Sequence, residues 1–325
     1  MKRLLIFSLI LALLLPCAFG CGGSTDDGKI SIVCTLFPQY DWVRSIVGES
    51  DSISVTLLVK NGADGHSYQP TAADIMTISS CDMIVYLGAD SDIWVQEALK
   101  RAKNDDTEKI ELTELEGITL HNISSSSHDH GDHGDHEHEH GHVFDEHIWL
   151  SLKNASVAID ALSESICAID ESNAELYRAN AERYKNELLA LDGEYSSAVA
   201  SVGDSNPFML FADRFPFVYL LEDYEIEYAA AFEGCTTDVD AGFDTVLRLI
   251  KEADEHKISY IAVTETSDMA LARTVAESAK GDIQIIVLNS LQGVTASQLE
   301  GDLSYLSAMR ENLRVISLAL GIKGE

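Results

Sequence analysis

Short apolar runs alternate with amphipathic stretches along both halves of the chain, which is the pattern of strands alternating with helices. The first half predicts strands at residues 30–36, 53–59, 83–87 and 118–120, and helices at 40–47, 72–79 and 92–102. The second half predicts strands at 208–211, 227–232, 260–263 and 283–288, and helices at 216–223, 244–256, 270–279 and 303–320. This order predicts an α/β fold with mainly parallel sheets and helices on both faces.

The longest amphipathic stretch lies between the two halves and predicts a helix over residues 173–199. Its apolar residues recur at the spacing of one helix face. They are Leu176, Tyr177, Ala181, Tyr184, Leu188, Leu191 and Tyr195. We therefore predict an N-terminal lobe at residues 30–171, a bridging helix at 172–202 and a C-terminal lobe at 203–325.

The first residues predict a targeting segment rather than part of the fold. Lys2 and Arg3 precede an apolar stretch at residues 4–15, which is too short to span a membrane. The small residue before Cys21 and the polar tail after it resemble a bacterial lipoprotein signal. That resemblance implies a signal peptide at 1–20, a lipid anchor on Cys21 and a tether at 21–29. An ordinary secretory signal cut near Gly20 is the alternative, and both place the protein outside the cytoplasm.

An internal polar tract at residues 124–143 contains seven of the eleven histidines of the chain, alternating with carboxylates. Neutral imidazole is the commonest side-chain metal ligand, and it suits zinc, copper, iron and nickel. The tract has almost nothing apolar to bury, so it cannot form a packed core. We interpret it as a collector of divalent metal ions with low specificity, rather than as a tag or a solvated acidic linker.

The chain is strongly acidic, with 54 acidic and 22 basic residues and a formal net charge of −32. A surface of this kind repels nucleic acid and anionic membrane surfaces and concentrates cations near the protein. We therefore predict no nucleic-acid partner. Solubility alone is the competing explanation for much of this charge.

The cysteines do not form a recognisable framework. Cys17 and Cys21 belong to the targeting segment, and the other four, at positions 34, 81, 167 and 235, lack the paired spacing of a metal site. Cys34 falls within the first predicted strand. We expect it to be a small buried hydrophobic residue.

Two histidine loops carry a specific resemblance to a known family. Residues 61–70, NGADGHSYQP, and 145–151, DEHIWLS, resemble the two metal loops of the zinc/manganese solute-binding lipoproteins of ABC importers. A His-rich insertion often precedes the second loop in that family, and the segments 211–217 and 305–313 also fit. The resemblance implies two βα lobes bridged by one rigid helix, with a metal cleft between them. It gives His66 and His147 as metal ligands, two of the roughly four that zinc prefers.

The C-terminal lobe departs from the family pattern. Arg214 falls where the family has its third ligand, and an arginine cannot bind a metal ion. Asp213, one residue earlier, and Glu265, at the end of a predicted strand, are the carboxylates that we assign as ligands instead. Asn289 falls at the place of the fourth ligand and is a weaker oxygen donor. The alternative is that Asp213 and Glu265 serve as helix caps or ion-pair partners.

The His-rich tract bears on which metal is bound. His140 and His142 are close enough to His147 in sequence to share its ion. Manganese prefers oxygen donors, whereas this chain offers a surplus of imidazole, so we expect Zn²⁺ and keep Mn²⁺ as the alternative.

The resemblance implies an extracytoplasmic receptor that captures Zn²⁺ and passes it to an ABC permease. The receptor would be monomeric and held at the outer face of the membrane by its lipid anchor. A surface metal buffer or adhesin with the same fold is a second hypothesis. A zinc metalloenzyme is a third, but the sequence has no HExxH motif and no clear general base beside His147. We therefore expect no enzymatic activity.

Overall fold

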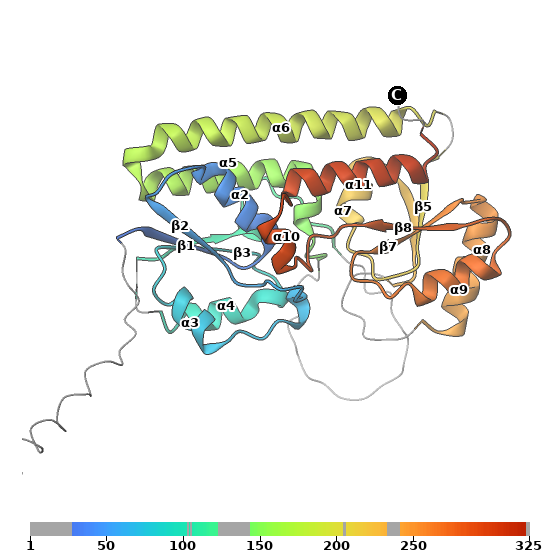
Figure 1. The fold of residues 1–325 in the computed structure, drawn as a ribbon, viewed down its shortest axis with the longest axis horizontal. Helices are drawn as coiled ribbons and strands as arrows, with labels where there is room; N and C mark the ends of the chain where they lie inside the picture. Colours follow the sequence, from blue (N-terminus) through green and yellow to red (C-terminus); the bar gives the residue numbers. More distant parts are fainter. Residues whose placement is uncertain are drawn as a thin grey trace, which may run out of the picture.

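The computed structural model describes residues 28–102, 104, 106–122, 144–203, 206–232 and 241–322. The predicted signal peptide, Cys21, Cys235 and the tract with His140 and His142 lie outside these described residues. No helix in the described part is long and apolar enough to cross a membrane. The fold contains two four-stranded sheets whose strand pairs are all parallel, which confirms the predicted fold class (Figure 1).

The first sheet has the strand order β2-β1-β3-β4 and lies between two layers of helices (Figure 1). Successive side chains of β1 point to opposite faces of the sheet and therefore pack into different hydrophobic cores. Ile32 and Cys34 pack with α2, and Val33 packs with α3 and α4. The elements are β1 (Ile30–Cys34), α2 (Phe37–Val47), β2 (Ile53–Leu57), α3 (Ala72–Ile78), β3 (Met83–Tyr86), α4 (Ile93–Leu99) and β4 (Glu108–Glu111).

The second sheet repeats this topology as β6-β5-β7-β8. The helices α8 and α9 cover one of its faces and α7 and α11 the other, so both faces are apolar. The elements are β5 (Phe208–Phe211), α7 (Val218–Asp223), β6 (Glu227–Ala230), α8 (Phe243–His256), β7 (Tyr260–Thr264), α9 (Ala270–Ser278), β8 (Gln284–Leu288), α10 (Ala296–Glu300) and α11 (Tyr305–Ala319).

The long helix α6 (Ala174–Ala200) agrees with the predicted helix to within one residue at each end. It packs against α2 and α5 beside the first sheet and against α11 beside the second (Figure 1). The helix α5 (Leu152–Ile169) was not predicted. It begins at Ser151, whose hydroxyl accepts the backbone N–H of Asn154, and it lies along α6.

The fourth strand of the first sheet was predicted wrongly. Residues 118–120 are not in a strand, and β4 lies at Glu108–Glu111, paired with β3. Within β4 only Ile110 is buried, because this is an edge strand in which Glu108 and Lys109 are exposed and Glu111 is partly buried. Charged residues are typical of exposed edges, so the segment lacks the apolar run that marks a central strand. The remaining predicted elements are present, with ends shifted by at most three residues.

Tyr305, at the start of α11, joins the two halves of the molecule. Its ring packs edge-on against Trp42 of α2 with centroids 5.3 Å apart, and its N–H donates to Asp41 over 3.0 Å. Its hydroxyl donates to the carbonyl oxygen of Trp149 over 2.6 Å. The side chain is fully buried, and burial raises the pKa of its hydroxyl well above the usual range. The hydroxyl is therefore a permanent hydrogen-bond donor.

We expect Tyr305→Phe to lower the free energy of unfolding by about 1–3 kcal/mol, because it leaves the buried Trp149 carbonyl without this donor. Urea denaturation followed by tyrosine and tryptophan fluorescence measures the change. Tyr260→Phe, at the partly buried start of β7, is the matched control and should leave the midpoint almost unchanged. Equal midpoints for the two variants would show that the Tyr305 hydrogen bond contributes nothing to stability.

Candidate metal centre

His66 is presented by the loop that follows β2. Asn61 and Gly62 both have a positive φ, of 63° and 75°, so the chain turns sharply here. The carboxylate of Asp64 accepts the backbone N–H of His66 over 3.0 Å and caps the 3₁₀ turn η1 (Gly65–Ser67). A Cβ at Gly65 would lie 3.2 Å from a methyl group of Leu36, which favours glycine beside the histidine.

His147 is held by the residue two positions before it. One oxygen of Asp145 accepts the backbone N–H of His147 over 2.9 Å and lies 2.8 Å from Nδ1 of its ring. The next three residues form the buried 3₁₀ turn η4 (Ile148–Leu150), which anchors the loop in the core. The side chain of His147 is only 2% exposed, so its ring is fixed both by packing and by this carboxylate.

The two predicted histidines converge. Their Nε2 atoms lie 3.4 Å apart. Two nitrogens at about 2.0–2.1 Å from a tetrahedral zinc ion would be separated by about 3.3–3.4 Å. Each Nδ1 faces a carboxylate, at 2.8 Å from Asp145 for His147 and at 3.7 Å from Glu146 for His66. A carboxylate at hydrogen-bond distance, as Asp145 is from His147, favours a proton on Nδ1 and directs Nε2 toward a metal, whereas the Glu146 contact is too long to be a hydrogen bond.

Glu146 links this pair to the loop after β3. One of its oxygens accepts the backbone N–H of Ser91 over 3.2 Å, and the other is the buried oxygen that faces His66. The same loop is fixed by Asp92, whose carboxylate accepts three backbone N–H groups. Burial raises the pKa of Asp92 to about 6, and the nearby Glu146 charge adds to this effect. The three donors are Leu87, Gly88 and Ala89.

Gln292, which no sequence motif indicated, contacts both histidines from the second half. Its amide nitrogen lies 2.6 Å from Nε2 of His147 and 3.1 Å from Nε2 of His66. It follows β8 in a tight loop where Leu291 has a φ of 63°. The one signal in the sequence was its position, three residues after Asn289 in a loop at the carboxyl end of the last strand.

The two carboxylates predicted for the second half support neighbouring loops. Asp213 accepts the backbone N–H of Thr264 over 3.0 Å and its hydroxyl over 2.7 Å. Glu265 accepts the backbone N–H and the hydroxyl of Ser290, each over 2.8 Å. Among the described residues, no three or more His, Cys, Asp or Glu side chains are grouped as a metal site. That Asp213 and Glu265 bind a metal stays a prediction.

The two positions at which the sequence departs from the family also have structural contacts. The Asn289 side-chain oxygen accepts the backbone N–H of Leu291 over 2.8 Å. The Arg214 guanidinium lies 3.3 Å from the second oxygen of Asp64, the residue that caps the His66 turn. Arg214 thus connects the segment after β5 to the first histidine loop.

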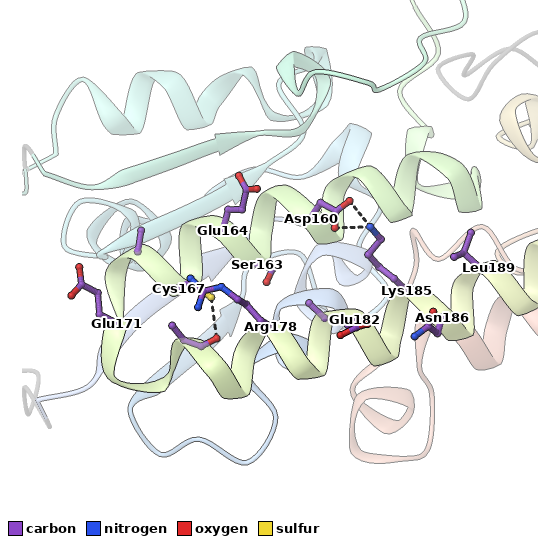
Figure 2. Close-up of a pocket in the computed structure, with 13 residues that line it drawn as sticks. Asp160, Ser163, Glu164, Cys167, Glu171, Arg178, Glu182, Lys185, Asn186 and Leu189 are labelled. Carbon is purple, nitrogen blue, oxygen red and sulfur yellow. Dashed lines mark hydrogen bonds and ion pairs between the residues drawn. The ribbon is translucent and has the colours of Figure 1, made fainter.

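A separate groove of about 870 Å³ lies between α5 and α6 (Figure 2). Lys185 forms an ion pair with Asp160 across it, and no histidine lines it. Its lining therefore does not offer the imidazole chemistry found at His66 and His147.

Comparison with known proteins gives consistent matches over most of the chain. Residues 32–319 match the family model described as zinc-uptake complex component A, periplasmic. The zinc-binding lipoprotein AdcA of Streptococcus pneumoniae is 28% identical over 317 residues, which cover 96% of this chain and 60% of AdcA. The high-affinity zinc uptake system protein ZnuA of Bacillus subtilis is 28% identical over 310 residues, covering 93% of each chain. The chain thus spans about three fifths of the length of the AdcA relatives.

A solved structure agrees with these matches. The Zn(II)-bound ZnuA-like domain of Streptococcus pneumoniae AdcA superimposes with a TM-score of 0.71 at 25% sequence identity, covering 90% of this chain and 99% of that domain. The family model spans both sheets and both histidine loops, as the resemblance of those loops predicts. The chain belongs to the family of the periplasmic zinc-uptake complex component A.

Proposed function

We propose that this protein is an extracytoplasmic receptor that captures Zn²⁺ at His66 and His147 and delivers it to an ABC permease. The observation that carries this proposal is the 3.4 Å separation of the two Nε2 atoms, with a carboxylate facing each Nδ1. The relatives named as zinc-binding and zinc-uptake proteins support the choice of metal and the role. The relative named as a lipoprotein supports the proposed membrane anchor at Cys21.

The proposed ligand set begins with the two imidazoles and adds the side-chain oxygen of Gln292, whose amide already lies at both rings. The side chains of Asp213 and Glu265 remain proposed ligands from the sequence. To reach the ion they would have to release Thr264 and Ser290. Two imidazoles with amide oxygen form a borderline donor set that suits zinc better than manganese.

The His-rich tract is proposed to collect ions beside this site. The residues that flank it are tied together, since Asp145 donates its N–H to the carbonyl of His121 over 2.9 Å and Asn122 pairs with Phe144. The second flank leads within three residues to His147. The chain would therefore run from the end of the proposed collector directly into the metal centre.

Removing either imidazole should abolish tight zinc binding. We expect His66→Ala and His147→Ala each to raise the zinc dissociation constant by more than the roughly 10–100-fold typical of losing an outer-shell partner. Competition with a chromophoric chelator measures this. His256→Ala is the control, because His256 is an exposed residue of α8. In zinc-depleted medium, the double variant should fail to restore growth to cells that lack the gene. Wild-type affinity in both single variants would exclude this site.

Zinc affinity should fall steeply with pH. Imidazole binds zinc only in its neutral form, so two protons compete with each ion. Once both rings are protonated, the apparent association constant should fall by about 100-fold for each unit of pH. Titrations at about pH 7.5, 6.5 and 5.5 measure the slope. A constant affinity over this range would mean that carboxylates rather than imidazoles bind the ion.

Deleting residues 124–143 tests the role of the tract separately. The flanking residues Asn122 and Phe144 already pair, so a short Gly-Ser linker can join them without disturbing the fold. We expect the variant to keep one tightly bound zinc ion per chain and to lose additional, weaker ones. Calorimetry with the full mature chain as reference measures both. Loss of the tight site on deletion would show that the tract supplies a ligand, as the sequence allows for His140 and His142.

A further inference from the structure

The turn that carries His66 has little buried structure of its own. In η1 only Gly65 is buried, and the side chain of His66 is 13% exposed. His147 differs, because its side chain is buried and all three residues of the η4 turn that follows it are buried as well. Packing therefore fixes His147, whereas the position of His66 depends more on the polar contacts of its loop.

Two contacts tie the His66 loop to the second half of the molecule. The backbone N–H of Gly62 donates to the carbonyl oxygen of Val294, in the loop after β8, over 2.9 Å. The Arg214 guanidinium, in the segment after β5, lies 3.3 Å from one oxygen of Asp64, and the other oxygen accepts the backbone N–H of His66. The Asp64 carboxylate therefore links Arg214 to the residue that bears the imidazole.

The segment around Arg214 is itself well anchored. Before it, Asp213 accepts the backbone N–H and the hydroxyl of Thr264. After it, Phe215 is buried, and its ring stacks on Tyr228 with centroids 4.3 Å apart. Because both neighbours are held, the Arg214 side chain extends from a fixed point on the second half.

We propose that Arg214 is a positioning residue of the zinc site: through the carboxylate of Asp64 it fixes the turn that carries His66 to the second half of the molecule. A ligand side chain that is already held in place loses less conformational freedom on binding. The two side chains are 41% and 30% exposed, so we expect loss of the pair to raise the zinc dissociation constant only about 2- to 5-fold. The inference rests on the proposed binding of zinc at His66.

Two substitutions of Arg214 test the proposal by competition with a chromophoric chelator. Arg214→Gln removes the charge and should raise the dissociation constant about 2- to 5-fold, and Arg214→Lys, which keeps the charge, should raise it less. Arg310→Gln is the matched control and should equal the wild type, because Arg310 of α11 forms a similarly exposed ion pair with Glu187 of α6. Loss of a positive charge by itself favours a cation. An equal or lower dissociation constant in Arg214→Gln therefore overturns the proposal.

Asp64→Asn tests whether the effect passes through Asp64. The asparagine keeps a side-chain oxygen for the His66 N–H but removes the charge that pairs with Arg214. In this background, Arg214→Gln should change the dissociation constant no further, because the interaction between the two side chains is already lost. An undiminished effect of Arg214→Gln in the Asp64→Asn background would exclude the proposed route.

Amide hydrogen exchange of the full mature chain, in buffer that contains a chelator, gives a measurement that does not depend on zinc. Arg214→Gln should speed exchange of the His66 N–H, which donates to Asp64, and leave unchanged that of the His147 N–H, which donates to Asp145. Unchanged exchange at His66, or an equal loss of protection at both histidines, contradicts a positioning role. Failure of the proposed function would appear separately, as absent zinc binding in the wild type.

Discussion

The Nε2 atoms of His66 and His147 lie 3.4 Å apart, which is the spacing of two nitrogen ligands on one tetrahedral zinc ion. A cation bound between these two atoms would contact both rings. Asp145 fixes the His147 ring, since it accepts the backbone N–H of His147 and lies 2.8 Å from Nδ1, and Glu146 faces the His66 ring at 3.7 Å. The second half places the amide of Gln292 at the same point, 2.6 Å from His147 and 3.1 Å from His66. The remaining structure serves to maintain this arrangement.

Trp149 is one of the side chains that join the two halves. It lies two residues after His147, and its indole donates to the carbonyl of Ser290, two residues before Gln292. One rigid side chain therefore connects the loops that carry the histidine and the amide. Its own carbonyl is fixed by the hydroxyl of Tyr305. The carboxylates of Asp213 and Glu265 accept hydrogen bonds from the hydroxyls of Thr264 and Ser290 and so fix the neighbouring loops. Residues around a metal site commonly orient its ligands in this way.

The sequence predicted most strands correctly because the central strands are short apolar runs, and it failed at β4, whose edge position permits charged residues. The helix α5 was predictable, since its buried residues recur at helical spacing. His66 and His147 were found because each lies in a local motif. Gln292 was not, because its position depends on the left-handed conformation of Leu291 and on the carboxylate of Glu265, which holds Ser290 from 25 residues away in sequence. Such contacts exist only in the folded chain.

Placing an uncharged amide at the histidine pair affects how the charge of an ion is balanced. The two imidazoles and the amide carry no negative charge, so the double charge of zinc has to be balanced by other groups, which are the proposed ligands Asp213 and Glu265 and the carboxylates one shell further out. Asp145 and Glu146 lie there, each facing an Nδ1 atom. Charge held at that distance attracts the ion less strongly than a directly bound carboxylate, because Coulomb energy falls with separation. Negative charge behind the imidazoles therefore favours release of the ion, which the proposed role as a receptor requires.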